Sequence, residues 1–227
     1  MLLAISPLII SLIMAILMPQ TQAKPRLQTT TKIWSILICT LEERKDSFNK
    51  LYNTLQAQIK ENMLDNKIEV LSHSDNREMT VGCKRNLLLN QSKGEYTCYI
   101  DDDDDIHPNY IKMIYEKLQK KPDCVSLTGI VTVNGKNPKK FIHSLAYKTW
   151  FEKDGIYYRP PNHLNPIKRS IAIRFLFPEI RHGEDVAWCL AIVKSGLLQK
   201  QELINEPYYF YNYNTNTSAC RPTKAKC

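Results

Sequence analysis

The chain has 227 residues, which is enough for one well-packed domain and leaves little room for a second. Charged residues make up 24% and hydrophobic residues 43%, so the composition is that of a globular protein and excludes a disordered one. The formal net charge of +8 favours acidic ligands, but no Lys/Arg run interleaves with aromatic residues, so nucleic acid is not expected as a partner.

The first 23 residues are expected to be a hydrophobic signal-anchor or signal peptide. Residues 1–23 carry no charged side chain, and residues 2–18 are almost wholly apolar. The basic residues follow this segment, beginning at Lys24, which by the positive-inside rule predicts an uncleaved membrane anchor with a cytoplasmic domain. Cleavage near Ala23 would instead release a secreted protein, and this alternative stays open.

The rest of the chain is expected to form a polar linker at 24–32, one domain at 33–213 and a polar tail at 214–227. Apolar runs and helical spacing alternate along the first half of the domain. They predict strands at 34–39, 68–71 and 96–100, and helices at 47–59, 80–90 and 108–119. This alternation is typical of an α/β domain with a Rossmann-like, mostly parallel sheet and helices on both faces.

The second half of the domain has a weaker pattern. A strand is expected at 125–133, a helix at 184–194 and a strand at 203–211. Residues 134–182 are rich in Pro, Asn and aromatic residues, and only short apolar pieces stand out among them.

Five consecutive aspartates, residues 101–105, follow the strand expected at 96–100. A hard divalent cation such as Mn²⁺ or Mg²⁺ binds carboxylate oxygens and commonly keeps substrate phosphates in its shell. Open α/β sheets bind ligands outside the carboxyl ends of their strands, which is where this run lies. The run therefore indicates a metal and phosphate site, with an acidic surface loop as the alternative.

Two segments together resemble a known family. KRNLLLNQSKGEYTCYIDDDDDIHPNYI (84–111) and HGEDVAW (182–188) resemble the central motifs of inverting family 2 glycosyltransferases of the GT-A fold. The resemblance implies a GT-A-like single domain that moves a sugar from a nucleotide-sugar, with UDP as the expected nucleotide, to a hydroxyl on a glycan or lipid-linked glycan. It also implies Mn²⁺ or Mg²⁺ as cofactor.

The resemblance assigns the donor side of the site. Asp101 matches the aspartate that contacts the donor nucleotide, and Asp103 matches the one that ligates the metal. Asp101 is expected to be a second metal ligand. Asp102 is placed with the donor site, although a solvated role is open for it. The remaining residues expected at the nucleotide-sugar are Thr40, Glu42, Asp75 and Arg85. Lys84 is expected to face solvent.

The resemblance also assigns the acceptor side. Asp185, with Glu184 beside it, matches the position of the catalytic base that removes the proton of the acceptor hydroxyl. An ordinary acidic pair at a helix start is the alternative explanation. The residues expected to line the acceptor site are His163, Asn165 and Lys168.

Two other functions remain open at this point. A nucleotidyltransferase of related architecture would also use carboxylates at a strand end, but it should carry a Gly-rich loop, and residues 40–44 contain no glycine. A secreted, non-catalytic carbohydrate-binding protein could share the fold, although the presence of Asp101, Asp103 and Asp185 argues against it.

Overall fold

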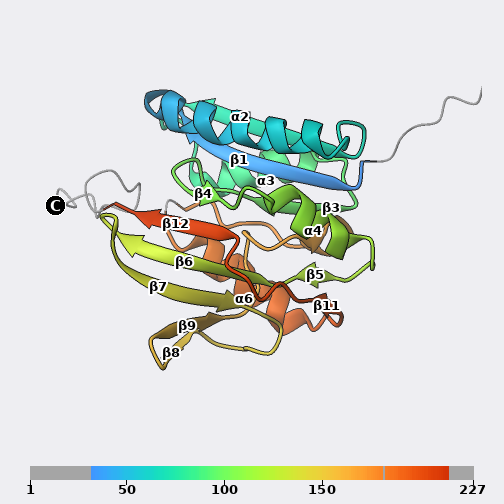
Figure 1. Ribbon diagram of the computed structural model, residues 1–227, viewed down its shortest axis with the longest axis vertical. Helices are drawn as coiled ribbons and strands as arrows, with labels where there is room; N and C mark the ends of the chain where they lie inside the picture. Colours follow the sequence, from blue (N-terminus) through green and yellow to red (C-terminus); the bar gives the residue numbers. More distant parts are fainter. Residues whose placement is uncertain (1–31, 181, 215–227) are drawn as a thin grey trace, which may run out of the picture.

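The computed structural model of the protein describes residues 32–180 and 182–214 (Figure 1). The predictions for the hydrophobic segment 1–23, for nearly all of the linker and for the tail beyond residue 214 lie outside these residues. Among the helices of the described ranges, none is long and apolar enough to cross a membrane.

The first sheet has six strands in the order β11-β5-β10-β3-β1-β2. Its members are β1 (Trp34–Leu41), β2 (Ile68–Asp75), β3 (Tyr96–Tyr99), β5 (Cys124–Val125), β10 (Ile167–Lys168) and β11 (Gln201–Glu202). The pairs β1–β2, β1–β3 and β5–β11 are parallel, whereas β10 runs antiparallel between β3 and β5. The parallel core predicted for the first half of the domain is therefore present.

A second sheet has the strand order β4-β12-β6-β7-β9-β8 and mixes parallel with antiparallel pairs. Its members are β4 (Asp105–Ile106), β6 (Leu127–Val133), β7 (Lys136–His143), β8 (Phe151–Lys153), β9 (Ile156–Arg159) and β12 (Tyr209–Tyr213). The expectation of one mostly parallel sheet was wrong in this respect. The first residues of β7 are polar and exposed, so β7 lacks the apolar alternation that reveals a strand.

The strand expected at 125–133 is divided at Ser126, where the chain passes from the first sheet into the second. The backbone N–H of Ser126 donates to the carbonyl of Glu202 at 2.9 Å, and its hydroxyl accepts from the N–H of Ile204 at 2.9 Å. Its carbonyl accepts from the hydroxyl of Tyr208. Of the strand expected at 203–211, only residues 209–211 are in a strand, as part of β12 (Tyr209–Tyr213), and residues 203–208 connect β11 to it.

Helices cover both faces of the first sheet, as predicted. On one face α2 (Lys45–Glu61), which follows the short helix η1 (Glu42–Arg44), packs with α4 (Tyr110–Leu118) against Trp34, Ile36 and Ile38 of β1. Leu37 points to the other face. It packs in a cluster with α3 (Val81–Gln91), α5 (Arg169–Ala172) and α6 (Glu184–Ser195). In Figure 1, α2 lies along β1 at one side of the molecule, and the second sheet lies at the other.

Candidate active site

The aspartate run begins where β3 ends, and Asp102 is turned into the protein. Its side chain is only 3% exposed. It accepts a hydrogen bond from the hydroxyl of Thr40 at 2.7 Å and pairs with Arg44 at 2.6 Å. Burial raises the pKa of Asp102, and the charge of Arg44 opposes that rise. The solvated role considered for Asp102 was wrong, and Thr40 contacts this carboxylate.

The end of the run ties this loop to the second sheet. Asp104 is buried and accepts from the hydroxyl of Tyr209 at 2.7 Å and from the N–H of Asn212 at 3.0 Å. Burial raises the pKa of Asp104 well above its usual range, and the neighbouring Asp101 raises it further. Asp105 is half-exposed and pairs with Lys50 at 2.7 Å. These two carboxylates therefore hold the loop.

Asp101 and Asp103 keep carboxylate surface open, with side chains 36% and 31% exposed. The side chain of Asp103 also pairs with Arg44 at 3.1 Å. Burial raises the pKa of Asp103, and its acidic neighbours add to the rise. Burial acts in the same direction on Asp101, but His163 and Arg85 outweigh it and hold the pKa of Asp101 below its usual value.

Arg85 lies on α3 and connects the two acidic motifs. Its guanidinium is 3.3 Å from Asp101 and 2.9 Å from Glu184, and it is almost fully buried. It lies 5.5 Å from the ring centroids of both Tyr99 and Phe177. The neighbouring carboxylates offset the cost of burying this charge and raise the pKa of Arg85. Arg85 therefore lies beside Asp101, and its predicted contact with the donor stays a prediction.

His163 lies between the carboxylates of the two motifs. Its Nε2 atom is 3.1 Å from Arg85 and 3.7 Å from Asp101, and its Nδ1 atom is 3.8 Å from Asp185. The ring is 5% exposed, and its Nδ1 atom has no hydrogen-bond partner among the described residues. The sequence placed His163 on the acceptor side, and the structure brings it within 4 Å of Arg85, Asp101 and Asp185.

The acidic pair at the start of α6 divides into two roles. Gly183, in the left-handed conformation, precedes the helix. Glu184 is buried against Arg85, so it is engaged in an ion pair and is not the free carboxylate expected beside Asp185. The side chain of Asp185 is 24% exposed and faces a cavity. Of the two, only Asp185 is placed to accept a proton from a substrate.

Lys84 was expected to face solvent, and this prediction was wrong. Its side chain is 3% exposed, donates to the carbonyl of Thr40 at 2.8 Å and forms an ion pair with Asp75. Asp75 also accepts the backbone N–H groups of Met79 and Arg77. The carboxylate of Asp75, which was expected at the nucleotide-sugar, is therefore engaged by groups at the ends of β1 and β2.

Three further residues that were expected at the site do not line the cavity. Glu42 is exposed beyond β1, at the edge where a nucleoside was expected. Asn165 is buried, where its oxygen faces His143 at 3.2 Å and its amide donates to the carbonyl of Val125 at 2.8 Å. Lys168 pairs with Asp123 at the amino end of β3, the end opposite to the aspartates. The structure therefore does not place Lys168 at the cavity that Asp185 lines.

A cavity of about 330 Å³ opens beside Asp185 and Asp101. It is also lined by Val131, Phe141, His143, Trp150, Tyr157, Arg159, Asn162, His163, Leu164 and Tyr211. Most of these residues belong to the second sheet or to the loops that leave it, so the sequence did not reveal them. The cavity combines two carboxylates, a guanidinium and several aromatic rings.

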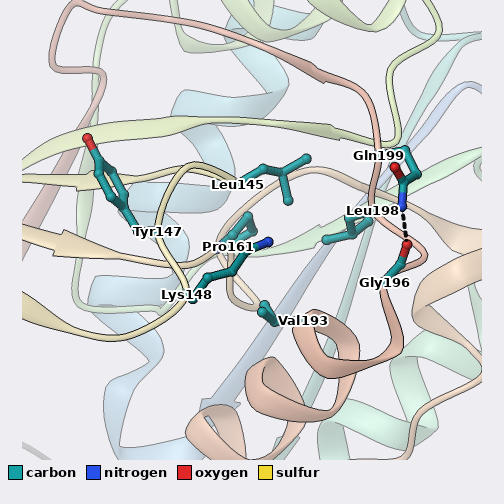
Figure 2. Close-up of a pocket in the computed structure, with 8 residues that line it drawn as sticks. All are labelled: Leu145, Tyr147, Lys148, Pro161, Val193, Gly196, Leu198 and Gln199. Carbon is teal, nitrogen blue, oxygen red and sulfur yellow. Dashed lines mark hydrogen bonds between the residues drawn. The ribbon is translucent and has the colours of Figure 1, made fainter.

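A second cavity of about 220 Å³ lies at the other end of α6 (Figure 2). Figure 2 shows Val193 and Gly196 at the carboxyl end of this helix, with Tyr147 and Lys148 across the cavity. Asp185 is in the first turn of the same helix, whose 12 residues span about 18 Å. The second cavity contains none of the acidic groups described above.

These features define an α/β domain whose acidic residues from two separate segments meet at one cavity. The model of the family described as Glycosyl transferase family 2 matches residues 35–183, about two thirds of the chain. The chain belongs to glycosyl transferase family 2. The matched residues include the five aspartates and end before Glu184 and Asp185.

Solved structures of Staphylococcus aureus TarS, residues 1–349, share the fold. One TarS structure matches with a TM-score of 0.55 and 16% identity, and the complex with UDP matches with a TM-score of 0.56 and 17% identity. Each match covers 79% of this chain and 60% of TarS 1–349. The complex with UDP-GlcNAc matches with a TM-score of 0.52 and 15% identity, over 79% and 58%. The chain therefore spans about three fifths of these structures, and no curated protein sequence matches it.

Proposed function

We propose that the protein transfers a sugar from a UDP-linked nucleotide-sugar to a hydroxyl group of a glycan or lipid-linked glycan, with inversion at the anomeric carbon. The observation that carries this proposal is that Asp101 and Asp185 face one cavity, with His163 between them. The UDP and UDP-GlcNAc complexes of TarS, which share the fold, support a uridine nucleotide as donor.

The carboxylates of Asp101 and Asp103 fit a divalent cation. Both offer hard oxygen atoms and remain about one third exposed. Residues 32–180 and 182–214 contain no group of three His, Cys, Asp or Glu side chains placed to hold a metal, so this part of the chain offers no closed cage. Mg²⁺ typically uses one or two carboxylates, with substrate phosphates and water completing its shell. When bound, Mn²⁺ or Mg²⁺ would neutralise charge on the leaving diphosphate.

The side chains of the protein supply the rest of the chemistry. Asp185 takes the proton of the acceptor hydroxyl as that oxygen bonds to the anomeric carbon. The bond from this carbon to the diphosphate breaks on the opposite face, and the nucleoside diphosphate leaves with the electron pair. Arg85 remains charged at any working pH and lies beside Asp101, where it can stabilise that leaving group. Glu184 and the rings of Tyr99 and Phe177 hold Arg85 in place.

The hydrophobic segment 1–23 and the basic residues after it support a location at the membrane, with the domain on the cytoplasmic side. Such a location suits a lipid-linked glycan as acceptor. Cleavage near Ala23 would favour the secreted alternative. The apparent mass of the cellular protein and its membrane fraction distinguish the two.

The donor half of the proposal is tested by thermal unfolding of the full chain with UDP, GDP or CDP, each with and without Mn²⁺. A ligand at a hundredfold excess over its dissociation constant stabilises the folded state by about 2.7 kcal/mol. We expect a Mn²⁺-dependent shift with UDP that Asp103→Asn removes and Asp65→Asn, at an exposed aspartate, leaves unchanged. A folded protein that shows no shift with any nucleotide contradicts the proposal.

The catalytic half is tested with Asp185→Asn. This substitution should keep the UDP shift while lowering kcat about 10²- to 10⁴-fold, since it removes only the general base. Retention of full turnover by Asp185→Asn would exclude Asp185 as the base.

A further inference from the structure

The cavity beside Asp185 contains one arginine whose charge is not matched. Arg159 ends β9, opposite His143 of β7, and is partly buried. The two other buried or partly buried arginines near the site, Arg44 and Arg85, both pair with aspartates. Within residues 32–180 and 182–214, no ion pair or side-chain hydrogen bond is formed by the guanidinium of Arg159.

Neither carboxylate that lines the cavity, Asp101 or Asp185, forms an ion pair with Arg159. Asp101 contacts Arg85 and His163, and Asp185 lies nearest to His163. A partly buried guanidinium without a counter-ion loses hydration without gaining a partner, and such groups in proteins are usually paired. An anionic group that enters with a substrate would therefore find the guanidinium of Arg159 available.

Aromatic rings line the same cavity. Trp150 is 59% exposed, although large aromatic residues are normally covered. Its ring stacks on Tyr157 with the centroids 5.7 Å apart and an interplanar angle of 28°. Phe141 and Tyr211 line the cavity as well. Aromatic faces pack well against the apolar C–H faces of sugar rings, so this lining favours a saccharide as the occupant.

Arg159 and the residues proposed to bind the donor phosphates come from different parts of the fold. In the proposed function Arg85 and Asp101 lie at the diphosphate; Arg85 is on α3, which packs on the first sheet, and Asp101 follows β3 of that sheet. Arg159 lies on the second sheet together with Tyr157. We therefore assign an anion bound at Arg159 to the acceptor and not to the nucleotide, although Asp101 lines the same cavity.

We propose that the acceptor is an acidic glycan whose carboxylate or phosphate is bound by Arg159 while its sugar ring packs against Trp150 and Tyr157. The planar guanidinium donates two parallel hydrogen bonds to either anion. Anchoring at these side chains would present an acceptor hydroxyl to Asp185, which lines the same cavity. This inference rests on the proposed function, because it makes this cavity the acceptor site of the transfer.

The test measures binding of glucuronate, glucose 6-phosphate and glucose to the full chain by saturation-transfer NMR, with UDP and Mn²⁺ present. We expect at least one acidic sugar to bind about 10-fold or more tightly than glucose, the range of one charge-assisted hydrogen-bonded pair. Tighter binding of glucuronate would indicate that Arg159 binds a carboxylate, and tighter binding of glucose 6-phosphate would indicate a phosphate. Arg159→Gln should abolish the preference, and Arg159→Lys, which keeps the charge without the fork, should retain part of it.

The matched control is Arg174→Gln, which removes the same charge from an exposed position outside the cavity and should leave the preference unchanged. Equal or absent binding of all three sugars to the wild type overturns the inference, as does an acid preference that survives Arg159→Gln. The UDP shift recorded on the same samples keeps the two proposals apart. If that shift is present while acid preference is absent, only the acidic acceptor is refuted.

Discussion

Acidification should destabilise this domain through His143, a histidine buried to 2% exposure beside the cavity. Its Nδ1 atom lies 3.2 Å from the oxygen of Asn165, which also accepts the N–H of Asn162. Because that oxygen is an acceptor, the Nδ1 atom must carry the proton in the neutral ring. Burial, and then the charge of Arg159, lowers the pKa of His143 from 6.5 to about 3.

The direction of the effect follows from proton binding. Between about pH 3 and pH 6.5 the unfolded chain binds a proton at His143 that the folded domain does not. The contribution to stability is therefore complete above pH 6.5 and is lost as the pH falls towards 3. At pH 5 the loss amounts to about 1.5 pH units at 1.36 kcal/mol each, or about 2 kcal/mol.

The assay is urea unfolding of the wild type and of His143→Asn at pH 7.5 and at pH 5. Asparagine does not titrate, and its amide can donate to Asn165 much as the Nδ1 atom does. The wild type should lose about 2 kcal/mol more than the variant over this interval, a difference of about 1 M in the urea midpoint. The other histidines and carboxylates titrate in both proteins, so only the difference between the two losses of unfolding free energy reports on His143. Equal losses would refute the reasoning.

Two further predictions concern packing around α3. Arg85→Met should cost about 3–5 kcal/mol of unfolding free energy because it leaves Glu184 buried without its partner, and adding Glu184→Gln should recover part of it. Unchanged stability of Arg85→Met in urea would contradict this. Gly82→Ala should destabilise by about 1–3 kcal/mol, since a Cβ atom there would lie 1.9 Å from the carbonyl oxygen of Pro178. Helix propensity alone predicts a gain, so a higher melting temperature would refute the clash.

Several features of the domain could be predicted from the sequence because they are local. The alternation of short apolar runs with helical spacing predicted β1 to β3 and the helices between them, and the helix boundaries fell within two residues. The aspartates stood out as a run at a predicted strand end, and Arg85 and Asp185 were singled out because their local motifs resemble those of the family. Their roles in catalysis stay proposals.

Other features depended on contacts between distant parts of the chain. Lys84 and Arg85 are neighbours on one helix, and no local pattern shows that both are buried. Lys84 lies against Asp75 and the carbonyl of Thr40, and Arg85 against Asp101 and Glu184. A buried charge is tolerated only where tertiary structure supplies its partner, so the partner has to be known first.

The sequence by itself determined the α/β class of the first half of the domain, the family resemblance and two carboxylates that face the cavity, Asp101 and Asp185. Only the tertiary structure decided that Ser126 passes the chain into a second sheet, and that β7 and β9 bring His143 and Arg159 beside Asp185. The reason is that strand pairing joins residues far apart in the chain, and the polar β7 carries no period-2 signal of its own. The part of the cavity that we propose as the acceptor site is built from that pairing.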